Sequence, residues 1–242
     1  ELHLDIIVDR LLREFNVKAN VGKPQVTYKE TVTSQGEAES VFDKQLGGKE
    51  VFGHVRILVK PSGKGAGLIL ENRLNQGVLP DIFIDDIEAG IRDAMESGVL
   101  AGYRMEDIRA EILEARYDEN LSAEMAYRIA AAGALREAVR KGRPTLMEPI
   151  MKLEVVAPDE YTGDIISDIN SRRGKIENID YRGALKIVDA RIPLAETFGY
   201  ATSVRSMSQG RASHTLQFSH YDVVPDNITD TLIARMTGQI YG

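Results

Sequence analysis

The sequence predicts an α+β protein with more than one domain. Its 242 residues, 43% of them hydrophobic, are enough to build separate apolar cores. After Pro149, strand-like and helix-like patterns alternate in a regular order, and the middle of the chain places two helical patterns among strands. The first residues add one helix and one strand. These three observations predict several α+β units in series.

The first predicted element is an amphipathic helix over residues 2–15. Its apolar residues recur at spacings of three and four: Leu4, Ile7, Leu11 and Phe15. An alternating strand follows around Gln25–Val32. Because one helix and one strand cannot bury both faces alone, we expect residues 1–33 to be the remnant of a domain that continues upstream. The chain is therefore expected to be a fragment.

The middle of the chain begins with a polar stretch, Thr33–Ser40, and continues with a strand over Val51–Pro61 that has loops at both ends. A helix is predicted over about Asp81–Ser97, with Gly98 as its stop. Residues 105–117 fit a helix or a strand equally well. An alanine-rich helix then runs over Ser122–Lys141 and ends at Gly142, and its small side chains allow close packing.

From Pro149 the pattern reads strand, helix, strand, strand, helix, strand. The predicted elements are a strand at residues 151–155, a helix after Pro158 that stops at Gly174, strands at 175–181 and Ala184–Ile192, a helix from near Ala195, and a strand with Leu216 and Phe218 on one face. In the third strand the apolar phase shifts between Ile187 and Val188, which indicates a bulge or burial on both faces. The order βαββαβ is ferredoxin-like. A last helix is predicted over about Pro225–Met236.

Composition excludes several classes of function. The chain has no cysteine, which rules out disulfides, cysteine-ligated metals and thiol catalysis, and its four histidines lack HExxH spacing, so we expect no metal site. No apolar run reaches the length of a membrane span and no basic leader opens the chain, so we expect a soluble, cytoplasmic protein. A net charge of −7 argues against bulk attraction to nucleic acid, and any RNA contact must be local.

No catalytic motif is evident. Gly63-Lys64-Gly65-Ala66-Gly67 lacks the spacing of a P-loop and is interpreted as a flexible turn. Asp85-Asp86 lies in the first turns of a predicted helix, where carboxylates complement the helix dipole. His214 and His220 share parity with the apolar positions of the last strand, so they are interpreted as half-buried structural residues. We expect no catalytic residue in this chain.

Two basic clusters follow predicted helices. One contains Arg172, Arg173 and Lys175, and the other contains Arg205, Ser206, Gln209, Gly210, Arg211 and Ser213. Arginines beside glycine and small hydroxyls suit close contact with phosphate oxygens. Cations at helix C-termini also complement the dipole. The pattern leaves both interpretations open.

These residues also carry a resemblance to the C-terminal part of bacterial elongation factor G. The similar stretches are ELHLDIIVDRLLREFNVKANVGKPQVTYKET, GGKEVFGHV, SAEMAYRIAAAGALREAVRKGRPTLMEPIMKLEV, PDEYTGDIISDINSRRGKI and IPLAETFGYATSVRSMSQGRASHTLQFSHYD. They cover nearly the whole chain in the family's order and spacing.

The resemblance implies three domains. Residues 1–33 would end the family's third domain, residues 34–148 would form the fourth, similar to the second domain of ribosomal protein S5, and residues 149–242 would form the ferredoxin-like fifth. It also implies a strand within residues 105–117 and a last helix that packs toward the fourth domain. The GTP-binding domain would lie upstream, so GTP and Mg²⁺ would bind there, with no cofactor in this fragment, and the full-length parent would be a GTPase.

The resemblance further implies a ribosome-binding monomer with no DNA or membrane partner, acting in GTP-dependent translocation of tRNA and mRNA. The fourth domain would reach the decoding region of the small subunit. The fifth would lie near the sarcin–ricin loop of large-subunit rRNA. This implication favours RNA contact for the two basic clusters.

Two predicted tip loops depart from the family. They contain Lys49, Glu50, Val51 and Phe52 in one, and Tyr117, Asp118, Glu119 and Asn120 in the other. The family commonly reads GGRGQYGH where this chain has GGKEVFGH, and a Tyr-His pair where this chain has Tyr117-Asp118. With Arg116, the charges in the two loops sum to −1, which is unfavourable beside phosphates.

These departures leave alternatives to translocation. One is a specialised paralogue for ribosome recycling or stalled ribosomes, and another is ribosomal protection against tetracycline-type drugs. A hypothesis from a different class is a ferredoxin-like module that binds a small molecule or serves assembly, which rests on fold analogy alone.

Overall fold

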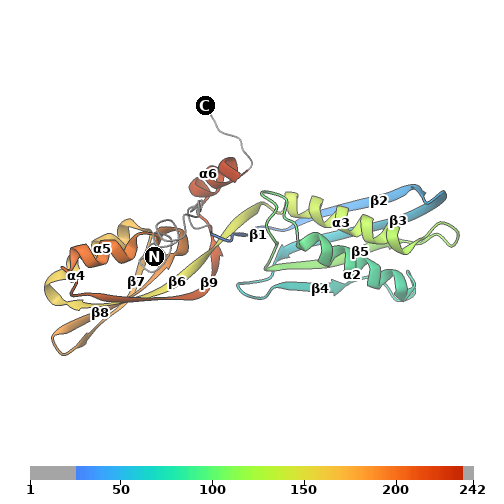
Figure 1. Cartoon of the computed structure of the whole chain (residues 1–242). Coiled ribbons are helices and arrows are strands. Elements are labelled where there is room, and N and C mark those ends of the chain that lie inside the picture. Colours follow the sequence, from blue (N-terminus) through green and yellow to red (C-terminus); the bar gives the residue numbers. More distant parts are fainter. Residues whose placement is uncertain (1–25, 237–242) are drawn as a thin grey trace, which may run out of the picture. The chain divides into compact units, whose positions relative to one another are not determined.

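The computed structural model describes residues 26–236 and divides into two compact units (Figure 1). Of the described residues, the four-stranded unit comprises 28–147 and 221–236, and the ferredoxin-like unit comprises 26–27 and 148–220. The helix predicted over residues 2–15 lies outside the described residues. The α+β prediction is confirmed.

In the four-stranded unit the sheet contains β2 (Gly36–Leu46), β3 (Lys49–Pro61), β4 (Leu68–Asn72) and β5 (Ile108–Arg116), in the order β2-β3-β5-β4. β4 and β5 are parallel, and the other pairs are antiparallel. Helices α2 (Asp81–Met95) and α3 (Glu124–Lys141) pack on one face of this sheet. Val55, Ile57 and Val59 alternate along β3 and are fully buried beneath them.

Small residues bring α3 close to its neighbours. A Cβ atom at Gly53 would lie 2.6 Å from the backbone of Ala126, and one at Gly90 of α2 would collide with the carbonyl oxygen of Arg128. Ala130, Ala134 and other alanines of α3 are fully buried. The predicted close packing of this alanine-rich helix is confirmed.

Two strands of this unit were not predicted from the pattern. β2 begins within the polar stretch Thr33–Ser40. The pattern did not reveal this strand, because its exposed positions include Glu37, Glu39 and Asp43 while only Gly36 and Ala38 are buried in its first half. β4 is short and half-buried. The ambiguous residues 105–117 form β5, which agrees with the strand that the resemblance implied.

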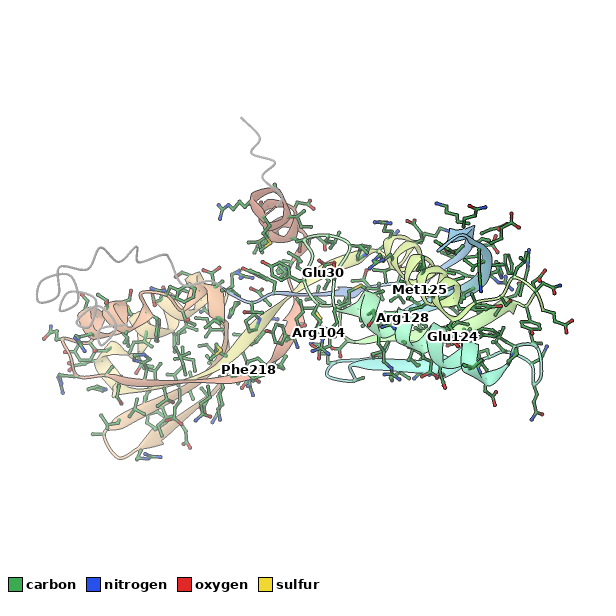
Figure 2. The ribbon with its side chains drawn as sticks, turned by 45° about the vertical axis from the view of Figure 1, so that its right-hand side comes forward. Glu30, Arg104, Glu124, Met125, Arg128 and Phe218 are labelled. Atoms are coloured by element: carbon green, nitrogen blue, oxygen red, sulfur yellow. The ribbon has the colours of Figure 1, made fainter. Side chains whose placement is uncertain are left out.

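The strand expected around Gln25–Val32 is shorter than predicted and forms β1 (Lys29–Val32). Glu30, labelled in Figure 2, is fully buried there, and its carboxylate accepts hydrogen bonds of 2.6 to 3.1 Å from four backbone amides. The donors are the amides of Val99, Leu100, Ala101 and Tyr103. This carboxylate fastens β1 to the loop that follows α2.

The ferredoxin-like unit contains β6 (Pro144–Pro158), α4 (Asp159–Ser171), β7 (Lys175–Arg182), β8 (Leu185–Pro193), α5 (Tyr200–Met207) and β9 (Ser213–Val223); the first residues of β6 and the last residues of β9 belong to the other unit. Since β9 and β8 both pair with β6, and β7 pairs with β8, the strand order is β9-β6-β8-β7. Ile165 and Ile169 of α4 and Val204 of α5 pack on the same core as Leu153 and Val155 of β6. The predicted βαββαβ order is confirmed.

Three details of this unit differ from the sequence pattern. Residues Leu194–Glu196 form only a 3₁₀ turn, and α5 begins at Tyr200, because Gly199 takes a positive φ of 77° that interrupts the helix. Phe218 is 59% exposed, although it shares the face of β9 on which Leu216 packs against the core (Figure 2). Ile187 and Val188 are both buried, so the phase shift in β8 reflects burial on both faces, and the irregularity lies in β7.

The last helix is confirmed as α6 (Asp226–Met236). It belongs to the four-stranded unit. Within that unit, the amide of Val224 donates to the carbonyl oxygen of Leu146 at 2.9 Å.

Candidate RNA-contacting sites

The two predicted tip loops lie together at the end of the β2–β3 hairpin. Gly47 and Gly48 have positive φ values of 60° and 82°, as a tight hairpin turn requires. Lys49–Phe52 is therefore the start of β3 and not a loop, which corrects the expectation. The amide of Phe52 donates to the carbonyl oxygen of Leu121 at 2.7 Å, and the amide of Ala123 donates back to Phe52 at 3.3 Å. We call residues 43–52 with 117–123 the tip.

Asp118 is used by its own loop. Its carboxylate accepts hydrogen bonds from the amides of Asn120 at 2.9 Å and Leu121 at 3.0 Å. The backbone amide of Asp118 donates to the Ser122 hydroxyl at 2.9 Å, and the Ser122 amide donates to the carbonyl oxygen of Asp118 at 3.0 Å. The side chain therefore closes an Asx-type turn. The Asp118 side chain is half-buried, whereas that of Glu119 is exposed.

Three aromatic side chains, Phe83, Tyr117 and Tyr127, lie close together at this loop. The Tyr127 side chain is fully buried, its hydroxyl donates to the carbonyl oxygen of Arg116 at 2.6 Å, and burial raises its pKa. The Phe83 ring lies 4.9 Å from the Tyr127 ring and 6.0 Å from the ring of Tyr117, which is 45% exposed. The end of β5 and the start of α3 are thereby held in one arrangement.

The first basic cluster is engaged within the fold. Arg172 donates to the Asp168 carboxylate at 2.9 Å, the carbonyl oxygen of Glu196 at 2.9 Å and the hydroxyl of Ser203 at 2.8 Å. Its guanidinium also lies 5.3 Å from the centre of the Tyr200 ring. Every nitrogen of this guanidinium has a partner, so little of it remains for a phosphate.

Arg173 is similarly committed. It forms a bidentate pair with the buried carboxylate of Glu148 at 2.8 and 2.9 Å, and its Nε donates to Glu196 at 2.9 Å. These carboxylates, Glu148 first, raise the pKa of Arg173. Lys175, the third member of the cluster, is exposed at the start of β7.

The second basic cluster spans the last turn of α5, which contains Arg205, and the turn that leads to β9; we call this segment, Arg205–Ser213, the Arg205–Ser213 loop. Its residues Arg205, Ser206, Gln209, Gly210, Arg211 and Ser213 are all exposed. The amide of Gly210 donates to the carbonyl oxygen of Arg205 at 2.8 Å, and both Gln209 and Gly210 have positive φ, which is the Schellman type of helix end. Buried Ser208 fixes the loop by donating to the carbonyl oxygen of Val204 at 2.7 Å.

The two arginines of this loop differ. Arg211 pairs with Glu160 at 2.5 Å and lies 5.6 Å from the centre of the Tyr161 ring. Arg205 has no ion-pair or hydrogen-bonding partner for its side chain among residues 26–236. The loop therefore presents an unpaired guanidinium on a rigid backbone.

The other residues considered for chemistry have structural roles. The amides of Gly65 and Gly67 both donate to the Asp107 carboxylate at 2.9 Å, so the glycine turn is filled by a side chain of this protein and does not cradle a phosphate. His214 and His220 are half-buried, as expected. The described residues contain no group of three potential metal ligands. Within the same range, no helix is long and apolar enough to span a membrane.

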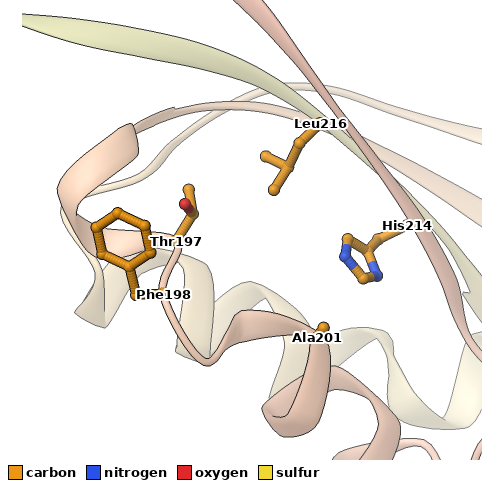
Figure 3. A pocket seen from close by; sticks show the side chains of 5 residues that line it. All are labelled: Thr197, Phe198, Ala201, His214 and Leu216. Atoms are coloured by element: carbon orange, nitrogen blue, oxygen red, sulfur yellow. The ribbon is translucent and has the colours of Figure 1, made fainter. Parts of the chain in front are cut away.

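A small cavity of about 200 Å³ lies between α5 and β9 (Figure 3). It is lined by Thr197, Phe198, Ala201, His214 and Leu216. The His214 ring stands edge-on to Tyr200 at 5.4 Å, and the Thr197 hydroxyl donates to the carbonyl oxygen of Leu194 at 2.8 Å. The lining contains no carboxylate to act with the histidine as an acid–base pair.

Sequence reasoning missed two kinds of residue. Lys44 reaches the tip because β2 pairs with β3 to the end of the hairpin, and the Gly47-Gly48 turn was the available signal for that pairing. Glu148 and Glu196 form ion pairs with Arg173, yet no local sequence pattern places these carboxylates beside it.

The described residues thus form two units with exposed polar sites, which is the character of a binding module. Comparisons with known proteins identify the family to which the chain belongs. The family model for elongation factor G domain IV matches residues 24–143, and that for the elongation factor G C-terminus matches residues 145–232. The chain belongs to the elongation factor G family.

Individual relatives agree. The chain is 53% identical over 235 residues to the elongation factors G of Thermotoga petrophila and Thermotoga sp. strain RQ2, covering 96% of this chain and 34% of each relative. A crystal structure of a protein from Thermus thermophilus is similar to this chain, with 34% sequence identity and a TM-score of 0.86. The similarity covers 98% of this chain and 36% of the Thermus thermophilus chain. The chain spans about a third of the length of the curated relatives it matches.

Proposed function

We propose that this chain is the ribosome-facing, C-terminal part of an elongation factor G-type translational GTPase that moves tRNA and mRNA through the ribosome. The observation that carries this proposal is the similarity to elongation factor G across 96% of the chain. Two preorganised, exposed sites support it: the tip, and the loop Arg205–Ser213. Residues 1–33, 34–148 and 149–242 would correspond to the end of the third, the fourth and the fifth domain.

GTP hydrolysis in this proposal belongs to a domain outside the chain, which would also hold Mg²⁺. The chain itself supplies surfaces that bind RNA, in a cytoplasmic, monomeric factor. Within these surfaces we assign phosphate contact to Lys175 and to the Arg205–Ser213 loop. We give Arg172 and Arg173 the role of holding the end of α4, because their guanidinium groups already donate to this protein's own oxygens.

The proposal is tested by measuring messenger movement on pre-translocation ribosomes with the full-length parent and GTP. We expect movement to be accelerated well above the factor-free rate, and a non-hydrolysable GTP analogue to slow multiple turnover. No acceleration over background would refute translocation as the function.

Ribosome recycling is a second candidate, and the altered tip motivates it. Asp118 closes a turn where the family commonly has a histidine, so the tip lacks that donor. Subunit splitting with ribosome recycling factor discriminates the two functions: splitting without messenger movement identifies a specialised paralogue. Asp118→His in the full-length parent is the companion variant, and it should increase messenger movement if the histidine is what the tip lacks.

A further inference from the structure

The short strand β1 is held along both of its edges. On one edge it pairs antiparallel with residues 144–147, the first residues of β6. On the other edge, the Glu30 amide donates to the carbonyl oxygen of Arg104 at 3.0 Å, and the Glu106 amide donates to the carbonyl oxygen of Glu30 at 2.8 Å (Figure 2). The chain enters the four-stranded unit through β1 and first leaves it through β6. What fastens this pair of strands therefore fixes how the unit is held.

The Glu30 side chain adds a fastening that the strand ladders do not supply. Its Oε2 atom accepts hydrogen bonds from the amides of Val99 at 2.6 Å and Leu100 at 2.9 Å. Its Oε1 atom accepts from the amides of Ala101 at 2.8 Å and Tyr103 at 3.1 Å. The carboxylate is fully buried and forms no ion pair with the described residues. A buried charge needs such partners, so the contact depends on all four amides staying in place.

The loop that supplies these amides is built around the carboxylate. A Cβ atom at Gly98 would lie 2.0 to 2.2 Å from the carboxylate atoms of Glu30. The loop follows α2, which ends at Met95, and the Met105 amide donates back to the carbonyl oxygen of Met95 at 2.7 Å. Both methionines are buried in the core of the four-stranded unit. Glu30 therefore connects β1 directly to the end of a core helix.

We propose that Glu30 is a positioning residue for translocation, which fixes the four-stranded unit to β1 so that a displacement of β1 is transmitted to the tip. This inference rests on the proposed function, since it names the contact that keeps the tip in place while tRNA and mRNA move. Packed elements transmit a displacement when the contact between them is rigid. Without the carboxylate contact, β1 shifts while the rest of the unit lags behind.

Asp107 offers a matched control, because it is a buried carboxylate of the same unit with a purely local contact. It is 7% exposed and accepts the amides of Gly65 and Gly67 at 2.9 Å each. These amides belong to the turn between β3 and β4. Asp107→Asn and Glu30→Gln make the same chemical change, since each replaces an accepting oxygen by an NH₂ group that faces amide donors.

The first experiment measures hydrogen exchange in the 242-residue chain. Glu30→Gln removes the charge, and Gly98→Ala displaces the carboxylate from the side of the loop while leaving Glu30 in the sequence. We expect both variants to accelerate exchange of the amides of residues 99–101 and 103 by about tenfold or more, because hydrogen bonds to a charged group are lost. Asp107→Asn should accelerate exchange at Gly65 and Gly67 and leave residues 99–103 unchanged.

The second experiment measures single-turnover messenger movement and GTP hydrolysis by the full-length parent on pre-translocation ribosomes. We expect Glu30→Gln and Gly98→Ala to slow movement by about 5-fold or more, the lower end of typical coupling between distant sites. The rate of GTP hydrolysis and the affinity for ribosomes should stay at the wild-type values. Asp107→Asn should move the messenger at the wild-type rate. A carboxylate that only stabilises the unit would not separate movement from GTP hydrolysis.

Several results would overturn this role. Unchanged exchange at residues 99–103 in both variants would show that the carboxylate is not the fastening. Accelerated exchange together with wild-type movement would show that the fastening does not serve translocation. An equal loss of movement in Asp107→Asn would assign the effect to general destabilisation. If Glu30→Gln does not fold, Gly98→Ala carries the same test. Absence of messenger movement with the wild-type parent would instead refute the proposed function itself.

Discussion

The ends of α4 and α5 look alike in sequence and behave differently in the fold. Both helices are followed by a residue with positive φ, Arg173 at 58° and Gln209 at 54°, then by glycine, and both regions carry arginines. At α4 the arginines meet Asp168, Glu148 and Glu196 and are used internally. At α5, Arg205 meets no partner among the described residues. The comparison teaches that an arginine at a helix end becomes structural or functional according to the carboxylates that tertiary structure brings to it.

The largest expected effect follows removal of the internal arginine. Arg173→Ala leaves the buried Glu148 carboxylate without its bidentate partner, and breaking such a pair costs about 3–5 kcal/mol. Urea unfolding of the ferredoxin-like unit measures this loss. Under conditions where the variant is still folded, we compare the salt slope of ribosome binding, which is the slope of log K against log salt concentration. The salt slope of the variant should equal that of wild type, and a reduced slope would show that Arg173 contacts RNA.

The second-largest effect on stability is expected at Gly174, which follows α4, and it should exceed the effect at Gly210, which follows α5. A Cβ atom at Gly174 would lie 2.7 Å from the carbonyl oxygen of Ile169 and would collide with the side chain of the same residue. Gly174→Ala must therefore shift the end of α4, at a cost of about 2 kcal/mol. Urea unfolding of this variant should show a clearly larger loss than the corresponding substitution at α5, and equal losses would contradict the difference in packing.

That corresponding substitution is Gly210→Ala. Nothing lies within 4 Å of a Cβ atom there, but the φ of 78° is strained for any residue with a side chain. We expect a loss of about 1 kcal/mol from backbone strain alone. Gly210→Asn, which tolerates the left-handed region better, should recover part of it in the same unfolding assay, and no recovery would point to a cause other than strain.

The smallest effect on stability is expected at the exposed arginine. Arg205→Ala should change the free energy of unfolding by less than about 0.5 kcal/mol, because its side chain is exposed and unpaired among the described residues. The same variant should bind ribosomes more weakly and reduce the salt slope by about 0.7–0.9. Arg235→Ala, at an exposed position in the last turn of α6, is the matched control and should leave the slope unchanged.

The sequence predicted those parts of the fold that local pattern controls. α2, α3 and the βαββαβ order follow from apolar spacing and from glycine stops such as Gly142 and Gly174, although α2 ends at Met95, before the predicted stop at Gly98. β2 escaped prediction because its exposed positions include the acidic residues Glu37, Glu39 and Asp43, and the late start of α5 depends on the conformation of Gly199.

The candidate sites divide in the same way. Gly47-Gly48 and the alternation after it locate the β2–β3 turn, but the approach of residues 117–123 to that turn requires the backbone hydrogen bonds between Phe52 and Leu121 and Ala123. The difference between Arg173 and Arg205 was out of reach of local pattern, because Glu148 lies 25 residues before Arg173 and reaches it only through the packing of this unit.

The central claim, that the chain contacts ribosomal RNA through two separate exposed sites, is tested most directly by chemical footprinting of rRNA on ribosomes saturated with the 242-residue chain. We predict protection in the decoding region of the small subunit and in the sarcin–ricin loop of the large subunit. The large-subunit protection should weaken with Arg205→Ala. Saturating binding without protection in either region would contradict the claim.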